Sequence, residues 1–230
     1  MKTNNLLLMM LLLSTLLWNN ATGKNVAEKV DNDNDPGFVL VKDVSGIQIF
    51  TRWIPVTESR SARQIKSELV MKGTIATVLS VLRNDRSFTK WMNGTKDYYR
   101  VKTIDSSQWY SYVQFSIPWP LNNQDCIIKY EVSEDPPGGK TMIRLTGTPS
   151  YIRHFEGVTR IPHMEGSWII TNLGHNKVKV EYSMFSNQKP SFPRWITDPI
   201  IQNNLLKTMA AFHDEVKKTV SEKNIDYVTN

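Results

Sequence analysis

Residues 198–220 read DPIIQNNLLKTMAAFHDEVKKTV, a segment whose apolar side chains recur every three or four positions. That spacing is the period of one face of an α-helix. The members of this face are Ile201, Leu205, Met209, Phe212, Val216 and Val220. Asp198 can cap the first free N–H groups, and Pro199 fits the first helical position because its missing N–H costs nothing there. A helix with one long apolar face needs a concave apolar partner.

The segments before this helix supply such a partner, because most of them alternate apolar and polar residues with the period of a β-strand. The expected strands are residues 38–43, 47–54, 64–72, 98–104, 108–117, 125–132, 141–147, 160–171 and 177–184. Thr74 is expected to cap a helix that ends near residues 84–85, and a second short helical piece includes Phe88, Trp91 and Met92. The pattern predicts an α+β fold, with an antiparallel sheet packed on the C-terminal helix in a single domain.

The N-terminus has the order of a secretory signal: Lys2, an apolar run over residues 6–18, then Ala21-Thr22-Gly23. The run is shorter than the roughly 20 residues that span a bilayer. We therefore expect a signal peptide at 1–23, a polar linker at 24–37, a domain at 38–222 and a tail at 223–230. The protein is expected to be exported, either periplasmic or secreted, and membrane-tethered if the signal is not cleaved.

Charge argues against a nucleic-acid partner. The formal charge is +6, but the basic residues are scattered among acids and form no stripe. This moderate charge fits a transient contact with an anionic membrane surface.

Catalytic and metal-binding patterns are weak. His154 and Glu156, and likewise His163 and Glu165, put a histidine and a carboxylate on one face of an extended segment, but no cysteine pair completes a zinc framework. The single cysteine, Cys126, lies in an apolar strand, where a thiol behaves as a small hydrophobe. We predict no metal, no cofactor and no enzymatic activity.

The composition favours instead an apolar site between sheet and helix. Ligand pockets are mostly apolar with a few placed polar groups. Gln114 and Arg144 are polar residues embedded in strands, although each can point outward to solvent. The candidate ligand-binding residues are Gln114, Arg144, Trp168, Ile170, Val180, Tyr182, Met184, Trp195, Ile201, Leu205, Met209 and Phe212. The alternative reading of the apolar ones is ordinary core packing.

Three stretches resemble START domains, the lipid-transfer domains related to the steroidogenic acute regulatory protein. They are FVLVKDVSGIQIFTR at 38–52, PWPLNNQD at 118–125, and RIPHMEGSWIITNLG at 160–174 followed by VEYSMF and FPRW. Gln124 departs from the family's usual arginine, which removes a possible buried ion pair, and residues 189–191 replace a Pro-Gly-Gly-like turn.

This resemblance implies a helix-grip fold, in which a curved sheet wraps the C-terminal helix around a tunnel for one lipid or sterol-like molecule. We therefore expect a monomeric carrier with no chemistry of its own. The last helix would be its cover, hinged at 189–195, with Lys207, Lys217 and Lys218 facing the membrane.

Two alternatives remain. The first is a polyketide cyclase-like enzyme that uses His163 or Arg144, for which a pocket with an inward histidine or carboxylate would argue. The second is an interaction module whose cavity has collapsed around methionine and tryptophan side chains, for which a packed interior would argue.

Overall fold

The computed structural model describes residues 37–228, except 59, 118, 120, 136, 138 and 188–191. The predicted signal peptide and residues 24–36 of the predicted linker lie outside the described residues. So do residues 189–191, which are part of the expected hinge.

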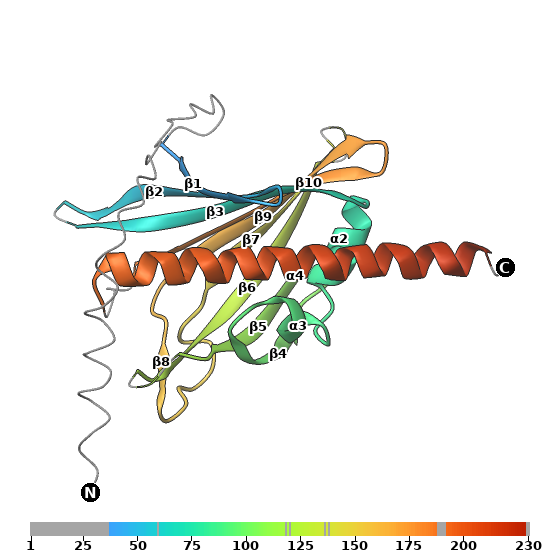
Figure 1. The fold of residues 1–230 in the computed structure, drawn as a ribbon. Helices are drawn as coiled ribbons and strands as arrows, with labels where there is room; N and C mark the ends of the chain where they lie inside the picture. Colours follow the sequence, from blue (N-terminus) through green and yellow to red (C-terminus); the bar gives the residue numbers. More distant parts are fainter. Residues whose placement is uncertain are drawn as a thin grey trace, which may run out of the picture.

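One large curved sheet forms most of the fold (Figure 1). Its strands are β1 (Val39–Val44), β2 (Ile47–Thr57), β3 (Arg60–Lys72), β4 (Thr95–Thr103), β5 (Gln108–Phe115), β6 (Asn123–Asp135), β7 (Lys140–Gly147), β8 (Val158–Arg160), β9 (Met164–Gly174) and β10 (Lys177–Ser186). The order across the sheet is β1-β2-β3-β10-β9-β7-β6-β5-β4. The α+β class and the antiparallel sheet expected from the sequence are confirmed.

Two features differ from a simple meander. β3 pairs with β10 rather than with β4, so strands from the two ends of the chain lie side by side. The strand expected at 160–171 is two strands, and the first of them, β8, pairs with β6 in parallel. Pro162 lies at the break, and proline cannot donate to a strand ladder.

Three helices in the described residues accompany the sheet: α2 (Ile75–Leu82), α3 (Phe88–Trp91) and α4 (Arg194–Val228). Thr74 caps α2 as expected, since its hydroxyl accepts a hydrogen bond from the N–H of Thr77 at 3.2 Å. α4 crosses the concave face of the sheet, and its C-terminal turns project beyond the strands (Figure 1). None of the helices in the described residues is long and apolar enough to span a membrane.

The beginning of α4 corrects the sequence analysis. The helix begins at Arg194, so Asp198 and Pro199 lie inside it rather than at its cap and first position. Pro199 lies beyond the first turn, so it removes the helical hydrogen bond that an N–H at this position would donate. Asp198 pairs instead with the guanidinium of Arg63 on β3. At its other end the helix continues to Val228, beyond the expected end at residue 220.

A tight contact in the sheet explains the Gly-x-Trp pattern of residues 166–168. A Cβ atom on Gly166 would lie 2.6 Å from the carbonyl oxygen of Ser183 and 3.3 Å from Leu145. Only glycine lets β9 approach its neighbours this closely. Trp168 is thereby held over the concave face, where it is buried.

A buried ion pair holds the segment between β7 and β8 against the convex face. The guanidinium of Arg160 donates to both carboxylate oxygens of Asp125, at 2.6 and 3.1 Å, and also to the carbonyls of Pro149, Ile152 and Arg153. Both side chains are buried. The adjacent Asp125 thus forms a buried ion pair with Arg160; this pair does not involve Gln124, so the loss of a possible ion pair at position 124 stays a prediction.

Candidate ligand-binding site

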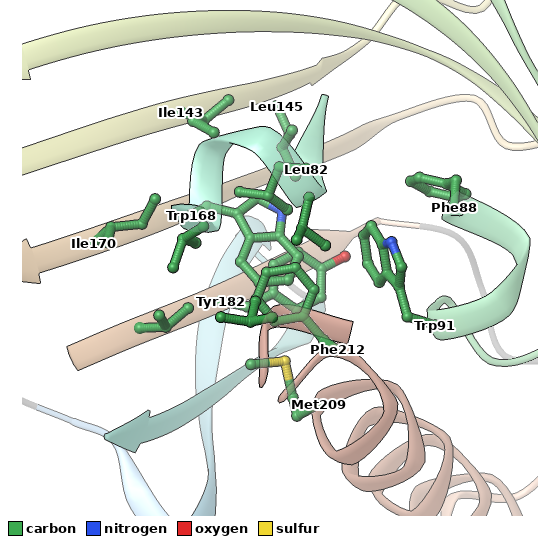
Figure 2. Packing of buried hydrophobic residues seen from close by; sticks show 14 of the residues in the cluster. Leu82, Phe88, Trp91, Ile143, Leu145, Trp168, Ile170, Tyr182, Met209 and Phe212 are labelled. Carbon is green, nitrogen blue, oxygen red and sulfur yellow. The ribbon is translucent and has the colours of Figure 1, made fainter. Parts of the chain in front are cut away.

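A layer of aromatic rings fills the space between the sheet and α4. Trp91 of α3, Trp168 of β9 and Phe212 of α4 meet edge to face or tilted (Figure 2). The ring centroid of Phe212 lies 5.0 Å from that of Trp91 and 5.0 Å from that of Trp168. Tyr182 of β10 stacks on Trp168 at 4.3 Å. Such ring pairs add about 0.5–1.5 kcal/mol each beyond the area they bury, so the layer holds the helix and the sheet together.

A small cavity of about 20 Å³ lies behind this layer. Its lining residues are Leu82, Phe88, Trp91, Met92, Val113, Phe115, Ile128, Tyr130, Leu145, Met164, Trp168, Tyr182 and Met184. None of them belongs to α4, so the aromatic layer separates the cavity from the helix. A space of this size holds about one water molecule.

The polar groups at the cavity belong to neutral side chains. Tyr130 and Tyr182 line it, and burial raises the pKa of both phenols well above the ordinary value of 10.0. Both hydroxyls therefore remain protonated near neutral pH. The other polar groups are the indole N–H groups of Trp91 and Trp168. That of Trp91 is buried and has no hydrogen-bond acceptor among the described residues.

Most of the predicted site residues lie on the concave side. Trp168, Ile170, Val180 and Tyr182 are buried in the sheet, and Met184 is partly buried. Leu205, Met209 and Phe212 of α4 are buried opposite them. The structure thus brings these residues together in one core, although only Trp168, Tyr182 and Met184 line the cavity.

Gln114 and Arg144 lie on the other face of the sheet. Val113 and Phe115 both line the cavity, and side chains alternate along a strand, so Gln114 between them faces the convex side. Arg144 is exposed between the buried Ile143 and Leu145. Neither polar side chain reaches the interior, where the sequence analysis had considered placing them.

Trp195 and Ile201 also lie outside the core, with exposed fractions of 75% and 50%. At this end α4 packs beside β2 and β3 through polar contacts. The guanidinium of Arg194 lies 4.1 Å from the ring centroid of Trp53, and Asp198 pairs with Arg63. The apolar pattern of the helix therefore continues into a region where no apolar surface of the described residues covers it.

The sequence analysis missed the contribution of α2 and α3 to the site. It assigned Leu82, Phe88 and Trp91 to helical pieces but not to a ligand site, although all three line the cavity. It also missed Ile128, Tyr130 and Leu145, which alternation along β6 and β7 placed on one face. The missing information was the register between strands, which brings these positions opposite Trp168.

No metal site is found in the described residues: no three histidine, cysteine, aspartate or glutamate side chains are placed to hold an ion together. The imidazole of His163 lies 3.2 Å from the carboxylate of Glu165, and both are solvent-exposed. Burial raises the pKa of Cys126 to about 12, so its thiol is an unreactive core group, as expected.

Solved structures of other proteins share this architecture. The STAR-related lipid transfer protein from Xanthomonas axonopodis matches with a TM-score of 0.70 and 25% identity, covering 79% of this chain and 99% of that chain. Human STARD10 matches with a TM-score of 0.67 and 18% identity, covering 85% of this chain and 79% of that chain. The chain has the START fold. The resemblance seen in the sequence is thereby confirmed at the level of the fold.

The chain is also similar to a curated sequence relative and, more weakly, to a solved enzyme structure. An uncharacterized protein of Pseudomonas aeruginosa is 21% identical over 179 residues, which cover 78% of this chain and 86% of the relative. The Zhui aromatase/cyclase from Streptomyces matches less well, with a TM-score of 0.50 and 13% identity over 69% of this chain and 95% of that chain. No protein-family model matches the chain.

Proposed function

We propose that this protein binds a lipid or another hydrophobic small molecule between its curved sheet and α4. The observation that carries the proposal is an apolar cavity at this position in a START fold. The similarity to a protein named as a lipid transfer protein supports the same ligand class. Burial of an alkyl chain contributes about 0.8 kcal/mol per CH₂, so binding requires no catalytic group.

Such binding requires the interior to open. Pockets for ligands of ordinary size enclose about 300–1,000 Å³, far more than the cavity of about 20 Å³. The aromatic layer occupies the intervening space, and Phe212 reaches it from α4 (Figure 2). Movement of α4 away from the sheet would withdraw Phe212 and join the cavity to the space beneath the helix. We therefore assign to α4 the role of cover.

Export and membrane contact complete the proposal. The charge, apolar run and small residues at 1–23 support export. Trp53, Trp195, Ile200 and Ile201 expose large apolar surfaces where α4 begins. Tryptophan is favoured at a membrane–water interface, and the exposed Lys207 adds attraction to anionic lipid. This end of the molecule is our proposed point of transient contact with the membrane.

Native mass spectrometry tests the ligand directly. The mature protein is incubated with vesicles of a natural lipid extract, separated from them and sprayed intact. We expect a bound hydrophobic molecule of defined mass on the folded chain. Met184→Trp, which fills the cavity, should lower the occupied fraction. Val70→Trp adds the same side chain at an exposed position and should not.

An unoccupied wild-type protein in this experiment would contradict the proposal. It would favour the second candidate, an interaction module with a filled interior, for which the small cavity is the supporting observation. A cyclase-like activity receives no such support. Two tyrosine hydroxyls and the two indole N–H groups of Trp91 and Trp168 are the polar groups of the lining side chains. Arg144 and His163, the residues suggested for that chemistry, are exposed.

A further inference from the structure

The indole N–H of Trp91 is a buried donor without an acceptor in the described residues. The side chain is 1% exposed and lines the cavity. Buried tryptophan N–H groups usually find a hydrogen-bond partner, because a donor removed from water without one destabilises the fold. An unpaired donor at the wall of a cavity therefore indicates that the space receives an acceptor.

Two tyrosine hydroxyls, those of Tyr130 and Tyr182, belong to residues that line the same cavity. In the view of Figure 2 the hydroxyl of Tyr182 points to the side on which Trp91 lies. A protonated phenol both donates and accepts, so these hydroxyls can complete the hydrogen bonds of a single guest atom together with Trp91.

The remaining wall excludes a charged guest. Every other lining residue is aliphatic, phenylalanine, methionine or the second tryptophan, and none carries a charge. An ionised phosphate or carboxylate would lose its hydration here and gain no counter-ion. The cavity has room for about one water-sized group. It thus fits one uncharged oxygen function and not a headgroup.

Building on the proposed function, we infer that the cavity holds the uncharged oxygen of an otherwise apolar lipid, such as a hydroxyl, ketone or ester carbonyl. The indole N–H of Trp91 donates to this oxygen, and the hydroxyl of Tyr182 supplies the second hydrogen bond. The hydrocarbon part lies between the aromatic layer and α4. The ligand class is therefore a neutral oxygenated lipid rather than a fatty-acid anion, a phospholipid or a plain hydrocarbon.

Three ligands of equal chain length test this inference: hexadecanol, hexadecanoate and hexadecane, radiolabelled and delivered from cyclodextrin to the wild-type protein. Hexadecanol should bind most tightly. Trp91→Phe should weaken hexadecanol binding by about 2- to 10-fold, the range expected for one neutral hydrogen bond. It should leave hexadecane binding nearly unchanged, so that the ratio of the variant to the wild-type dissociation constant is near one. Hexadecane therefore controls for the change in ring size.

Trp109→Phe is the matched control. Trp109 is also buried and has an unpaired indole N–H, but it does not line the cavity. Its substitution should not alter the preference for the alcohol. Tyr182→Phe removes a single oxygen atom and should reduce the same preference, so the inference remains testable if Trp91→Phe does not fold.

The outcomes separate the two proposals. Equal binding of all three ligands, or tightest binding of hexadecanoate, overturns the acceptor site and leaves hydrophobic binding intact. An alcohol preference that survives Trp91→Phe and Tyr182→Phe also overturns the site, and indicates a cavity that holds water only. Failure of the wild-type protein to bind any of the three overturns both proposals.

Discussion

The two halves of α4 carry the same apolar periodicity but lie in opposite environments. In the half after residue 204, Leu205, Met209, Phe212 and Val216 are buried against the sheet and the short helices. In the half before it, Trp195, Ile200 and Ile201 are exposed. Periodicity shows which side chains share a face of a helix. It does not show whether another element covers that face.

The difference also separates two roles. The buried half joins the aromatic layer through Phe212 and so closes the interior. The exposed half is held to the sheet by the ion pair between Asp198 and Arg63, and presents apolar side chains to solvent. In the proposed function, the exposed half contacts the membrane and the buried half covers the ligand.

Truncation of one apolar side chain in each half should give the greatest contrast. Phe212→Ala removes a fully buried ring and should lower the free energy of unfolding by about 3–5 kcal/mol. Ile201→Ala, at a half-exposed position, should change it by less than about 0.5 kcal/mol. Urea unfolding followed by circular dichroism measures both. Similar losses in the two variants would show that the halves are not packed differently.

Enlargement of one side chain in each half should give a smaller contrast. Met209 is fully buried, and Met209→Trp should cost about 1–3 kcal/mol of stability through overpacking. Ile201→Trp should be close to neutral because solvent accommodates the added ring. The same unfolding experiment measures the effect. A Met209→Trp variant as stable as the wild type would mean that the interior has more room than the packing indicates.

The exposed half should affect membrane binding without affecting stability. Trp195→Ala should lower partition onto anionic vesicles by about 5-fold, the effect of losing about 1 kcal/mol of interfacial burial. Leu173→Ala changes an exposed residue on the β9–β10 hairpin, away from the start of α4 (Figure 1), and serves as the control. Vesicle sedimentation measures the bound fraction. Equal partition of both variants would remove the membrane role of Trp195.

The smallest effect is expected at the ion pair that holds the exposed half. Asp198→Asn should lower stability by about 0.5 kcal/mol, because the pair is partly open to solvent and screened. Asp214→Asn, at an exposed carboxylate on the same helix, should change it by less. Thermal unfolding at low and high salt measures both. A loss at Asp198 that does not shrink at high salt would argue against an electrostatic role.

Much of the fold could be predicted from the sequence because local chemistry determines it. Alternation placed the strands within a few residues of their observed bounds, and Thr74 identified the beginning of α2. The need for glycine at position 166 was not predicted, because it depends on the approach of a neighbouring strand: a Cβ there would lie 2.6 Å from the carbonyl oxygen of Ser183. The split between β8 and β9 was missed because the residues around Pro162 keep an alternating pattern.

The site was harder to predict because it depends on contacts between distant segments. The pairing of β3 with β10 brings Trp168 and Tyr182 into the same core as α2 and α3. Nothing in the local pattern shows that Phe88 and Trp91 complete the cavity wall. Alternation alone does not show whether Gln114 and Arg144 face the concave or the convex side of the sheet. The structure places both on the convex side.

Photocrosslinking tests most directly whether a hydrophobic ligand enters the space between the sheet and α4. A hexadecanol analogue with a diazirine in its chain would be bound, irradiated and mapped by peptide mass spectrometry. We predict crosslinks on the concave core, in peptides that contain Trp91, Trp168 or Phe212. Crosslinks confined to the exposed start of α4, around Trp195 and Ile201, would show that the ligand stays on the surface and would contradict an internal site.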